Sequence, residues 1–341
     1  KLYVAKEGPS VLGWLDQRAL NIVLDPNGVE QVKIVNDNRD YSITLRDKFP
    51  ELFSGKIGAL KDFTHRIVLK VNAVPRVHKS RNIPWVIRDE VNKELESLLQ
   101  RGIIEEVDAS EWISPLVAVR KANGKIRLCI DLRYLNDNIV VERFPLPRIS
   151  EMIALTKNME WFTSIDLPSA YHQVRLHEDS KNLTAFMTPQ GCFRYVRMPF
   201  GLASAAAVFQ KLMHKLFKDV EGVIVFQDDI LIMGKNRMQH DERVNRVLGI
   251  QREKGLTAEF SKCTFGVQHL NYLGHEITMS GIRPKKELLS AIRGAPSPNN
   301  KDELRSFLGL AEFYARFVRN FSEKTFNLRQ LLKERCKFAW T

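Results

Sequence analysis

One apolar segment carries two adjacent aspartates, and it constrains the fold more than any other stretch of the chain. The segment reads Val223-Ile-Val-Phe-Gln-Asp-Asp-Ile-Leu-Ile-Met233. Apolar β-formers on both sides predict two short buried strands, with Asp228 and Asp229 at or near the turn between them. Carboxylates beside a core are costly unless a partner offsets their charge, and Mg²⁺ is such a partner. A hairpin with two solvated turn residues is the plainer alternative.

A third carboxylate, Asp166, ends the predicted strand Trp161-Phe-Thr-Ser-Ile-Asp166. Joining a hydroxyl to a phosphate uses one metal ion to activate the nucleophile and a second to hold charge on the leaving pyrophosphate, the two about 4 Å apart and bridged by carboxylates. One aspartate at a strand end and a pair on a neighbouring hairpin meet that demand. Three unrelated surface aspartates would have the same spacing, so spacing alone leaves both interpretations open.

The charge balance points to a polyanionic partner. The 341 residues include 52 Lys and Arg against 40 Asp and Glu, a formal net charge of +12. Residues 281–341 hold 13 of these bases and 6 acids, which gives this tail +7. A grip on a phosphate backbone would use such an excess, although a solvated helical face would look the same.

Cysteine spacing excludes a structural zinc protein, and hydropathy excludes a protein that spans a membrane. The four cysteines are far apart and no His cluster accompanies them, so we expect reduced thiols and no structural zinc. No apolar stretch approaches the length of a membrane span, and the N-terminus lacks a signal-peptide pattern. The cysteines are Cys129, Cys192, Cys263 and Cys336.

Hydrophobic periodicity predicts an α+β fold. Strand, helix, hairpin and helix follow one another in the centre of the chain, which describes a split β-α-β unit and not a doubly wound sheet. We expect helices at 88–101, 149–157, 204–219 (with Ser204 as N-cap) and 237–254, and strands at 116–121, 125–130 and 161–166. An edge hairpin is expected at 272–278. The tail is expected to be helical, starting at Pro284 and continuing at 301–318 behind the caps Asn299 and Asn300.

Several motifs occur in an order that resembles one known family. The chain is similar to the reverse transcriptase of gypsy-type long-terminal-repeat retrotransposons, a part of their Pol polyprotein that is related to retroviral reverse transcriptases. The similarity runs from about residue 49 to residue 341. The motifs are Trp112-Ile-Ser-Pro115, Gly124-Lys-Ile-Arg-Leu-Cys-Ile-Asp-Leu-Arg-Tyr-Leu-Asn136, Phe144-Pro-Leu-Pro147, Ser164-Ile-Asp-Leu-Pro-Ser-Ala-Tyr171, Met198-Pro-Phe-Gly-Leu202, Phe226-Gln-Asp-Asp229, Tyr272-Leu-Gly-His275 and Arg305-Ser-Phe-Leu-Gly-Leu310.

The resemblance implies a right-hand polymerase with fingers, a palm and a helical thumb. Residues 1–45 would be the tail of an upstream retropepsin with a linker, 46–280 the fingers and palm, and 281–341 the thumb and the start of a connection domain. No Asp-Thr-Gly or Asp-Ser-Gly occurs, so we expect no working aspartic protease. Because the chain starts at Lys1 and stops abruptly at Thr341, we expect a piece of a longer polyprotein.

The resemblance also assigns site residues, each at a position that matches a family motif. Asp166, Asp228 and Asp229 would bind two Mg²⁺ ions, for which Mn²⁺ is a substitute, and Lys262 would act as general acid toward pyrophosphate. The residues implied in nucleotide binding are Lys121, Arg127, Tyr171, Phe200, Gly201 and Gln227, with Tyr171 excluding a ribose 2′-hydroxyl; plain aromatic packing is the alternative for Tyr171. The implied primer-binding residues are Tyr272, Leu273, Gly274 and His275.

Some positions depart from the family pattern. Phe226 stands where Tyr is usual, Gln227 is polar where a small or apolar residue is common, and Pro168 and Ala170 replace the typical Ala and Gly. Ala205-Ala-Ala207 lacks the usual proline. These departures bear on rate and fidelity, and the metal triad is intact.

The expected function is RNA-directed and DNA-directed DNA synthesis from a primer. The implied partners are an RNA template, a DNA primer or duplex, dNTPs and other parts of the same polyprotein, with no membrane; the expected location is a cytoplasmic virus-like particle, with the nucleus as alternative. A degenerate or domesticated fragment that binds nucleic acid without catalysis is the main rival. An RNA-dependent RNA polymerase is a third option, which the bulk of Tyr171 disfavours.

Overall fold

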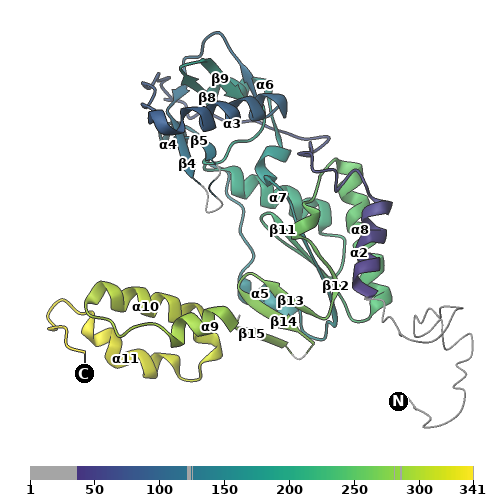
Figure 1. Cartoon of the computed structure of the whole chain (residues 1–341), viewed down its shortest axis with the longest axis vertical. Coiled ribbons are helices and arrows are strands. Elements are labelled where there is room, and N and C mark those ends of the chain that lie inside the picture. The colour runs from purple at the N-terminus through teal and green to yellow at the C-terminus, as the bar shows by residue number, and fades with distance from the viewer. Residues whose placement is uncertain (1–36, 121–123, 125, 280, 285, 341) are drawn as a thin grey trace, which may run out of the picture.

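The computed structural model describes residues 37–120, 124, 126–279, 281–284 and 286–340. Within them the chain forms a sheet-rich part, a central sheet with its helices, and a C-terminal group of helices, in the order expected for fingers, palm and thumb (Figure 1). The expected retropepsin tail up to residue 36 and the nucleotide-binding candidate Lys121 lie outside the described residues.

The palm is built on an antiparallel sheet ordered β10-β11-β6-β12. Its strands are β6 (Trp161–Asp166), β10 (Val223–Phe226), β11 (Asp229–Gly234) and β12 (Thr264–Val267). Side chains alternate between the two faces of a strand. On β11, Ile230 and Ile232 join the main core, whereas Leu231 and Met233 join a second, smaller core. Burial on both faces explains why the segment reads as a continuous apolar run.

Two helices cover the main-core face of this sheet. They are α7 (Ala205–Phe217) and α8 (Arg237–Lys254). The bounds of α8 match the prediction because its ends are encoded locally: the Asn236 side chain accepts from the Gln239 amide, and Gly255 ends the helix at φ +73°. Ser204 is the N-cap residue of α7, as predicted, but its side chain makes no capping hydrogen bond.

An additional helix, α2 (Asp37–Lys48), packs beside β12. Its Leu45 is buried in the main core. The predicted domain boundary at residue 45 therefore falls inside a helix that is packed on the palm, which the irregular polarity of this segment did not reveal.

The fingers contain two small sheets and the helix α3 (Arg88–Gln100), shown at the top of Figure 1. One sheet is ordered β2-β9-β8-β3 and the other pairs β4 with β5. The strands are β2 (Ile104–Glu106), β3 (Ile113–Ser114), β4 (Leu116–Arg120), β5 (Ile126–Ile130), β8 (Ala185–Thr188) and β9 (Gly191–Tyr195). The predicted helix at 88–101 is confirmed: α3 buries Val91, Leu95 and Leu98 and is followed by Gly102 with φ +61°.

The junction of fingers and palm is a narrow set of short elements. β1 (Thr64–His65) pairs in parallel with β7 (Arg175–Leu176), and the 3₁₀ helix η2 (Ala170–Gln173) immediately precedes β7. Because Asp166 ends β6, the short connection to η2 fixes where Tyr171 lies relative to the aspartates.

A separate three-stranded sheet covers the second face of the palm sheet. It contains β13 (His269–Tyr272), β14 (His275–Thr278) and β15 (Gly281–Pro284), and the helix α5 (Ile149–Leu155) lies beside it in Figure 1. The expected hairpin at 272–278 is therefore two strands of three. Pro284 ends a strand and does not start a helix; as an edge-strand residue opposite His275 it need not donate to the ladder.

The thumb consists of α9 (Lys286–Arg293), α10 (Lys301–Phe313), η5 (Ala315–Phe317) and α11 (Phe321–Leu331). The predicted cap of α10 is confirmed: the Asn300 side chain accepts from the amides of Asp302 and Glu303, at 3.1 and 2.9 Å. The predicted helix 301–318 instead breaks at Tyr314 into η5. Within the part of the chain that the structure describes, no helix is long and apolar enough to cross a membrane.

Candidate active site

Strand register brings the three aspartates together. Phe226 pairs with Asp229 at the end of the β10–β11 hairpin, so Gln227 and Asp228 form its two-residue turn. On the next strand pair, Asp229 lies directly opposite Asp166. Opposed residues of an antiparallel pair have Cβ atoms about 5 Å apart. Asp166, Asp228 and Asp229 therefore meet at one end of the palm sheet.

The turn is held by Gln210, a buried residue of α7 that the sequence analysis did not single out. Its side-chain oxygen accepts from the Gln227 amide at 2.7 Å, and its side-chain nitrogen donates to the Val225 carbonyl at 2.8 Å. Gln227 has a left-handed φ of +54°, which costs a non-glycine residue energy. The two hydrogen bonds from the Gln210 side chain offset that cost and fix the position of Asp228.

The aspartates repel one another. Burial first, and then the charges of Asp228 and Asp166, raise the pKa of Asp229 to about 6, whereas Lys262 acts in the opposite direction. The amine of Lys262 lies 3.3 Å from a carboxylate oxygen of Asp166. One lysine against three carboxylates leaves this end of the sheet negative, which favours a cation.

The donor set suits a divalent ion. Three carboxylates provide the hard oxygen ligands that Mg²⁺ prefers. Within the described residues, however, no three His, Cys, Asp or Glu side chains close on one point as a ready metal cage. Asp166, Asp228 and Asp229 therefore supply ligands of the right chemical kind, but not a preformed cage.

A pocket of about 480 Å³ opens beside the aspartates. It brings together most of the predicted catalytic and nucleotide-binding residues on one surface, and its wall includes α3 of the fingers. Its lining includes Arg127, Asp166, Tyr171, Phe200, Gln227, Asp228 and Lys262. A nucleotide-sized molecule would reach basic, aromatic and acidic groups there at the same time.

Aromatic contacts form one wall of this pocket. The ring centroid of Tyr171 is 5.3 Å from that of Phe200, and the Arg127 guanidinium lies over the Phe200 ring at 5.2 Å. Burial, and then the charge of Asp228, raise the pKa of Tyr171, so its hydroxyl stays protonated. Both interpretations of Tyr171 stay predictions, since its ring packs against the main core and also lines the pocket. Gly201 follows Phe200 with φ +90°, a conformation that favours glycine.

The predicted primer-binding residues lie apart from the pocket, in the turn between β13 and β14. Tyr272 pairs with His275, and Leu273 and Gly274 both have positive φ, the geometry of a tight type I′ hairpin turn. Burial, and then the charges of Asp229 and Asp228, raise the pKa of Tyr272. The turn is therefore close enough to the aspartates for their charges to act on it.

A second residue missed in the sequence is Gln173, which ties η2 to the palm. Its amide nitrogen donates to the carbonyls of Pro168 and Thr257, and its oxygen accepts from the Thr257 amide at 2.9 Å. Gln173 is fully buried. Gln173 and Gln210 are polar residues within apolar segments, and this was the only signal in the sequence that could have marked them. Their hydrogen-bond partners, which lie far away in sequence or on another element, could not be predicted.

Residues 119–277 match the family model described as reverse transcriptase (RNA-dependent DNA polymerase). The chain carries a reverse transcriptase domain. That domain covers both strands of the aspartate hairpin and every predicted site residue. Relatives of this chain include transposon polyproteins, which agrees with its resemblance to gypsy-type retrotransposons.

Several curated relatives are transposon polyproteins. The chain is 29% identical over 339 residues to the retrovirus-related Pol polyprotein from transposon 412 of Drosophila melanogaster, and 32% identical over 302 residues to that from transposon 297. These alignments cover 92% and 86% of this chain but 27% and 28% of the relatives, so the chain spans about a quarter of their length. The Tf2-3 polyprotein of Schizosaccharomyces pombe is 32% identical over 75% of the chain and 19% of its own length.

Solved structures of the foamy viral protease-reverse transcriptase share the fold. One in complex with double-stranded DNA aligns with a TM-score of 0.79 at 25% identity, over 99% of this chain and 70% of that one. Another, in complex with an RNA/DNA hybrid, aligns with a TM-score of 0.76 at 25% identity, over 91% and 42%. The reverse transcriptase domain therefore has the expected right-hand α+β polymerase fold.

Proposed function

We propose that this chain is a primer-dependent DNA polymerase that copies RNA, and also DNA, with dNTPs as substrates. The observation that carries the proposal is the pairing of Asp229 with Asp166 beside a pocket that also holds Arg127 and Tyr171. Carboxylates and a guanidinium that line one pocket suit a metal-bound triphosphate. The foamy viral relatives bound to duplexes support nucleic acid as the partner.

Asp166, Asp228 and Asp229 would hold two Mg²⁺ ions, which would supply Lewis-acid stabilisation of charge on the oxygens that exchange at phosphorus. Arg127 would bind the triphosphate, and Phe200 would support the base pair. The ring of Tyr171 would exclude a 2′-hydroxyl. Lys262 would donate a proton from its amine to the departing pyrophosphate, and Tyr272 to His275 would hold the primer end.

Primer extension on an RNA template tests this function. We expect extension with dNTPs and Mg²⁺, and little with NTPs. The variant Asp228→Asn should lose at least a thousandfold in rate while it binds primer-template nearly as well, because it removes metal charge and few backbone contacts. Exposed Asp219→Asn, away from the pocket, is the matched control.

Two results would count against the proposal. A wild-type chain that binds duplex but extends no primer would favour the nucleic-acid-binding fragment without catalysis. Extension with NTPs at a rate similar to that with dNTPs would favour an RNA polymerase and would leave Tyr171 as a packing residue.

A further inference from the structure

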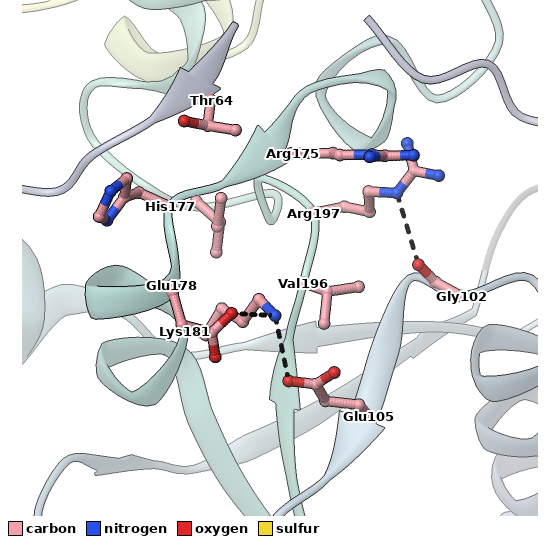
Figure 2. Close-up of a pocket in the computed structure, with 10 residues that line it drawn as sticks. Thr64, Gly102, Glu105, Arg175, His177, Glu178, Lys181, Val196 and Arg197 are labelled. Carbon is pink, nitrogen blue, oxygen red and sulfur yellow. Dashed lines mark hydrogen bonds and ion pairs between the residues drawn. The ribbon is translucent and has the colours of Figure 1, made fainter. Parts of the chain in front are cut away.

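A second pocket lies at the junction of fingers and palm and has no role in the proposed reaction. Its volume is about 560 Å³, and it shares no lining residue with the pocket beside the aspartates. Figure 2 shows residues from β1, β7 and the strand-like segment at Val196 and Arg197 around it. Two arginines, Arg175 and Arg197, line this pocket and have no role in the proposed reaction.

Strand pairing places these arginines together. Arg175 on β7 pairs with Thr64 on one side and with Arg197 on the other. Residues opposed in a ladder point to the same face. In Figure 2 both side chains extend in the same direction, and their guanidinium groups end near one another. Burial first, and then the charge of Arg175, lower the pKa of Arg197, as expected for two close like charges.

The acids around the pocket are already paired with other bases. Glu178 lies 2.6 Å from the Lys181 amine, and Glu105 lies 2.7 Å from Arg194. In the adjoining pocket, which shares Arg175 and Thr64, Asp62 pairs with Lys254 at 3.5 Å. Among the described residues, no carboxylate forms an ion pair with Arg175 or Arg197. The charges of Glu105 and Glu178 are therefore neutralised by these bases, whereas the charges of Arg175 and Arg197 are not neutralised by any described carboxylate.

The two arginines differ in what already holds them. The Arg197 guanidinium donates to three backbone carbonyls, Gly58 at 2.9 Å, His172 at 3.2 Å and Gly102 at 3.4 Å. The Arg175 side chain is exposed and has no hydrogen-bond partner among the described residues. Arg197 is therefore a fixed part of the junction, and Arg175 has donors available for a ligand.

We propose that Arg175 and Arg197 form a binding site for a phosphate group at the fingers–palm junction. Arg175 offers a free guanidinium fork that matches phosphoryl oxygens, and Arg197 adds its charge and its Nη2 group, which none of the three carbonyls holds. Inorganic phosphate as a dianion would neutralise both charges, and the phosphodiester of a nucleic acid strand, a monoanion, presents the same kind of phosphoryl oxygen. The proposal does not depend on the polymerase activity proposed above.

The variant Arg175→Gln tests the site without disturbing the junction, because Arg175 holds none of the three carbonyls that Arg197 holds. Exposed Arg246→Gln on α8 is the matched control, with the same loss of charge. Inorganic phosphate is titrated against chloride at equal ionic strength, and binding is followed by calorimetry and by the thermal unfolding midpoint, in metal-free buffer. A single-stranded DNA oligonucleotide is then tested as a competitor.

We expect phosphate at ten times its dissociation constant to raise the midpoint of the wild type and of Arg246→Gln by about 2 °C. Arg175→Gln should bind phosphate at least tenfold more weakly. If the oligonucleotide displaces phosphate from the wild type, the bound group is a backbone phosphate; if it does not, the site takes free phosphate. Equal phosphate binding by Arg175→Gln and Arg246→Gln, or no binding by the wild type, would overturn the proposal.

Discussion

At the scale of single residues, the aspartate site is a local source of instability. Asp229 carries the raised pKa that follows from burial and from two neighbouring carboxylates. A group whose pKa is higher in the folded than in the unfolded state binds more protons when folded, so stability falls as the pH rises through that interval. The ionised carboxylate of Asp229 therefore lowers the stability of the protein when no cation is bound.

Replacing Asp229 with Asn should stabilise the metal-free protein. Its folded pKa is about 6 against a reference of 3.8. The gain should be about 1 kcal/mol above pH 6, after allowance for solvent screening, and should vanish below about pH 4, where the carboxyl is protonated in both states. Thermal unfolding with a chelator, measured from pH 4 to 8, checks this.

Thermal unfolding with added Mg²⁺ distinguishes metal binding at the aspartates from a general effect of the salt on stability. We expect Mg²⁺ to stabilise the wild type and not Asp229→Asn. The control is Asp219→Asn, at an exposed position where metal binding should be unaffected. A variant that is no more stable than the wild type at pH 8 would contradict the expected repulsion.

At the scale of elements, the aspartate hairpin depends on a helix that packs behind it. Gln210 bonds on both sides of the turn, to the Val225 carbonyl and to the Gln227 amide. Gln210→Met keeps the length of the side chain but leaves both backbone groups unpaired. We expect a cost of about 2 kcal/mol and a fall of at least tenfold in kcat, because Asp228 loses its fixed position.

Two variants test whether this effect is specific. Gln210→Glu accepts from the Gln227 amide but donates nothing to Val225, so its kcat should be intermediate. Val91→Ala in α3 should be destabilised by a similar amount while it keeps kcat nearly unchanged below its unfolding temperature. Equal losses of kcat in Gln210→Met and Val91→Ala would reduce Gln210 to a core residue.

Local signals and distant partners explain which elements could be predicted from the sequence. The ends of α8 and the cap of α10 depend on residues within a few positions, and the aspartate turn follows from apolar strands on both sides. Pro284 was misassigned because its strand exists only through pairing with β14. Gln210 and Gln173 were missed for the same reason. The fold brings their hydrogen-bond partners near, and no sequence motif indicates which backbone groups those partners are.

At the scale of the whole molecule, the boundary of the thumb follows from sheet pairing. A deletion beginning at Gly281 would remove β15 and expose the edge of β14. A deletion after Pro284 keeps that sheet complete and removes only the helices. It is the sharper test of the basic tail.

We expect the chain truncated after Pro284 to bind duplex more weakly and to make shorter products. If thumb cations contact phosphates, each lost contact should reduce the slope of log affinity against log salt by about one. Binding measured from 50 to 300 mM salt, for both chains, provides the slopes. Identical slopes would mean that the tail is a solvated helical face and that the duplex is held elsewhere.

Tyr314 joins the thumb to the palm by more than the connecting chain. Its hydroxyl lies 3.2 Å from the Gly274 carbonyl, and its ring lies 6.1 Å from that of His275. A rotation of the thumb that keeps these contacts must carry the β13–β14 turn with it. If that turn holds the primer end, as proposed, the width of the duplex under the thumb would be transmitted as a displacement of the primer, and a mispaired or distorted helix would slow its own extension.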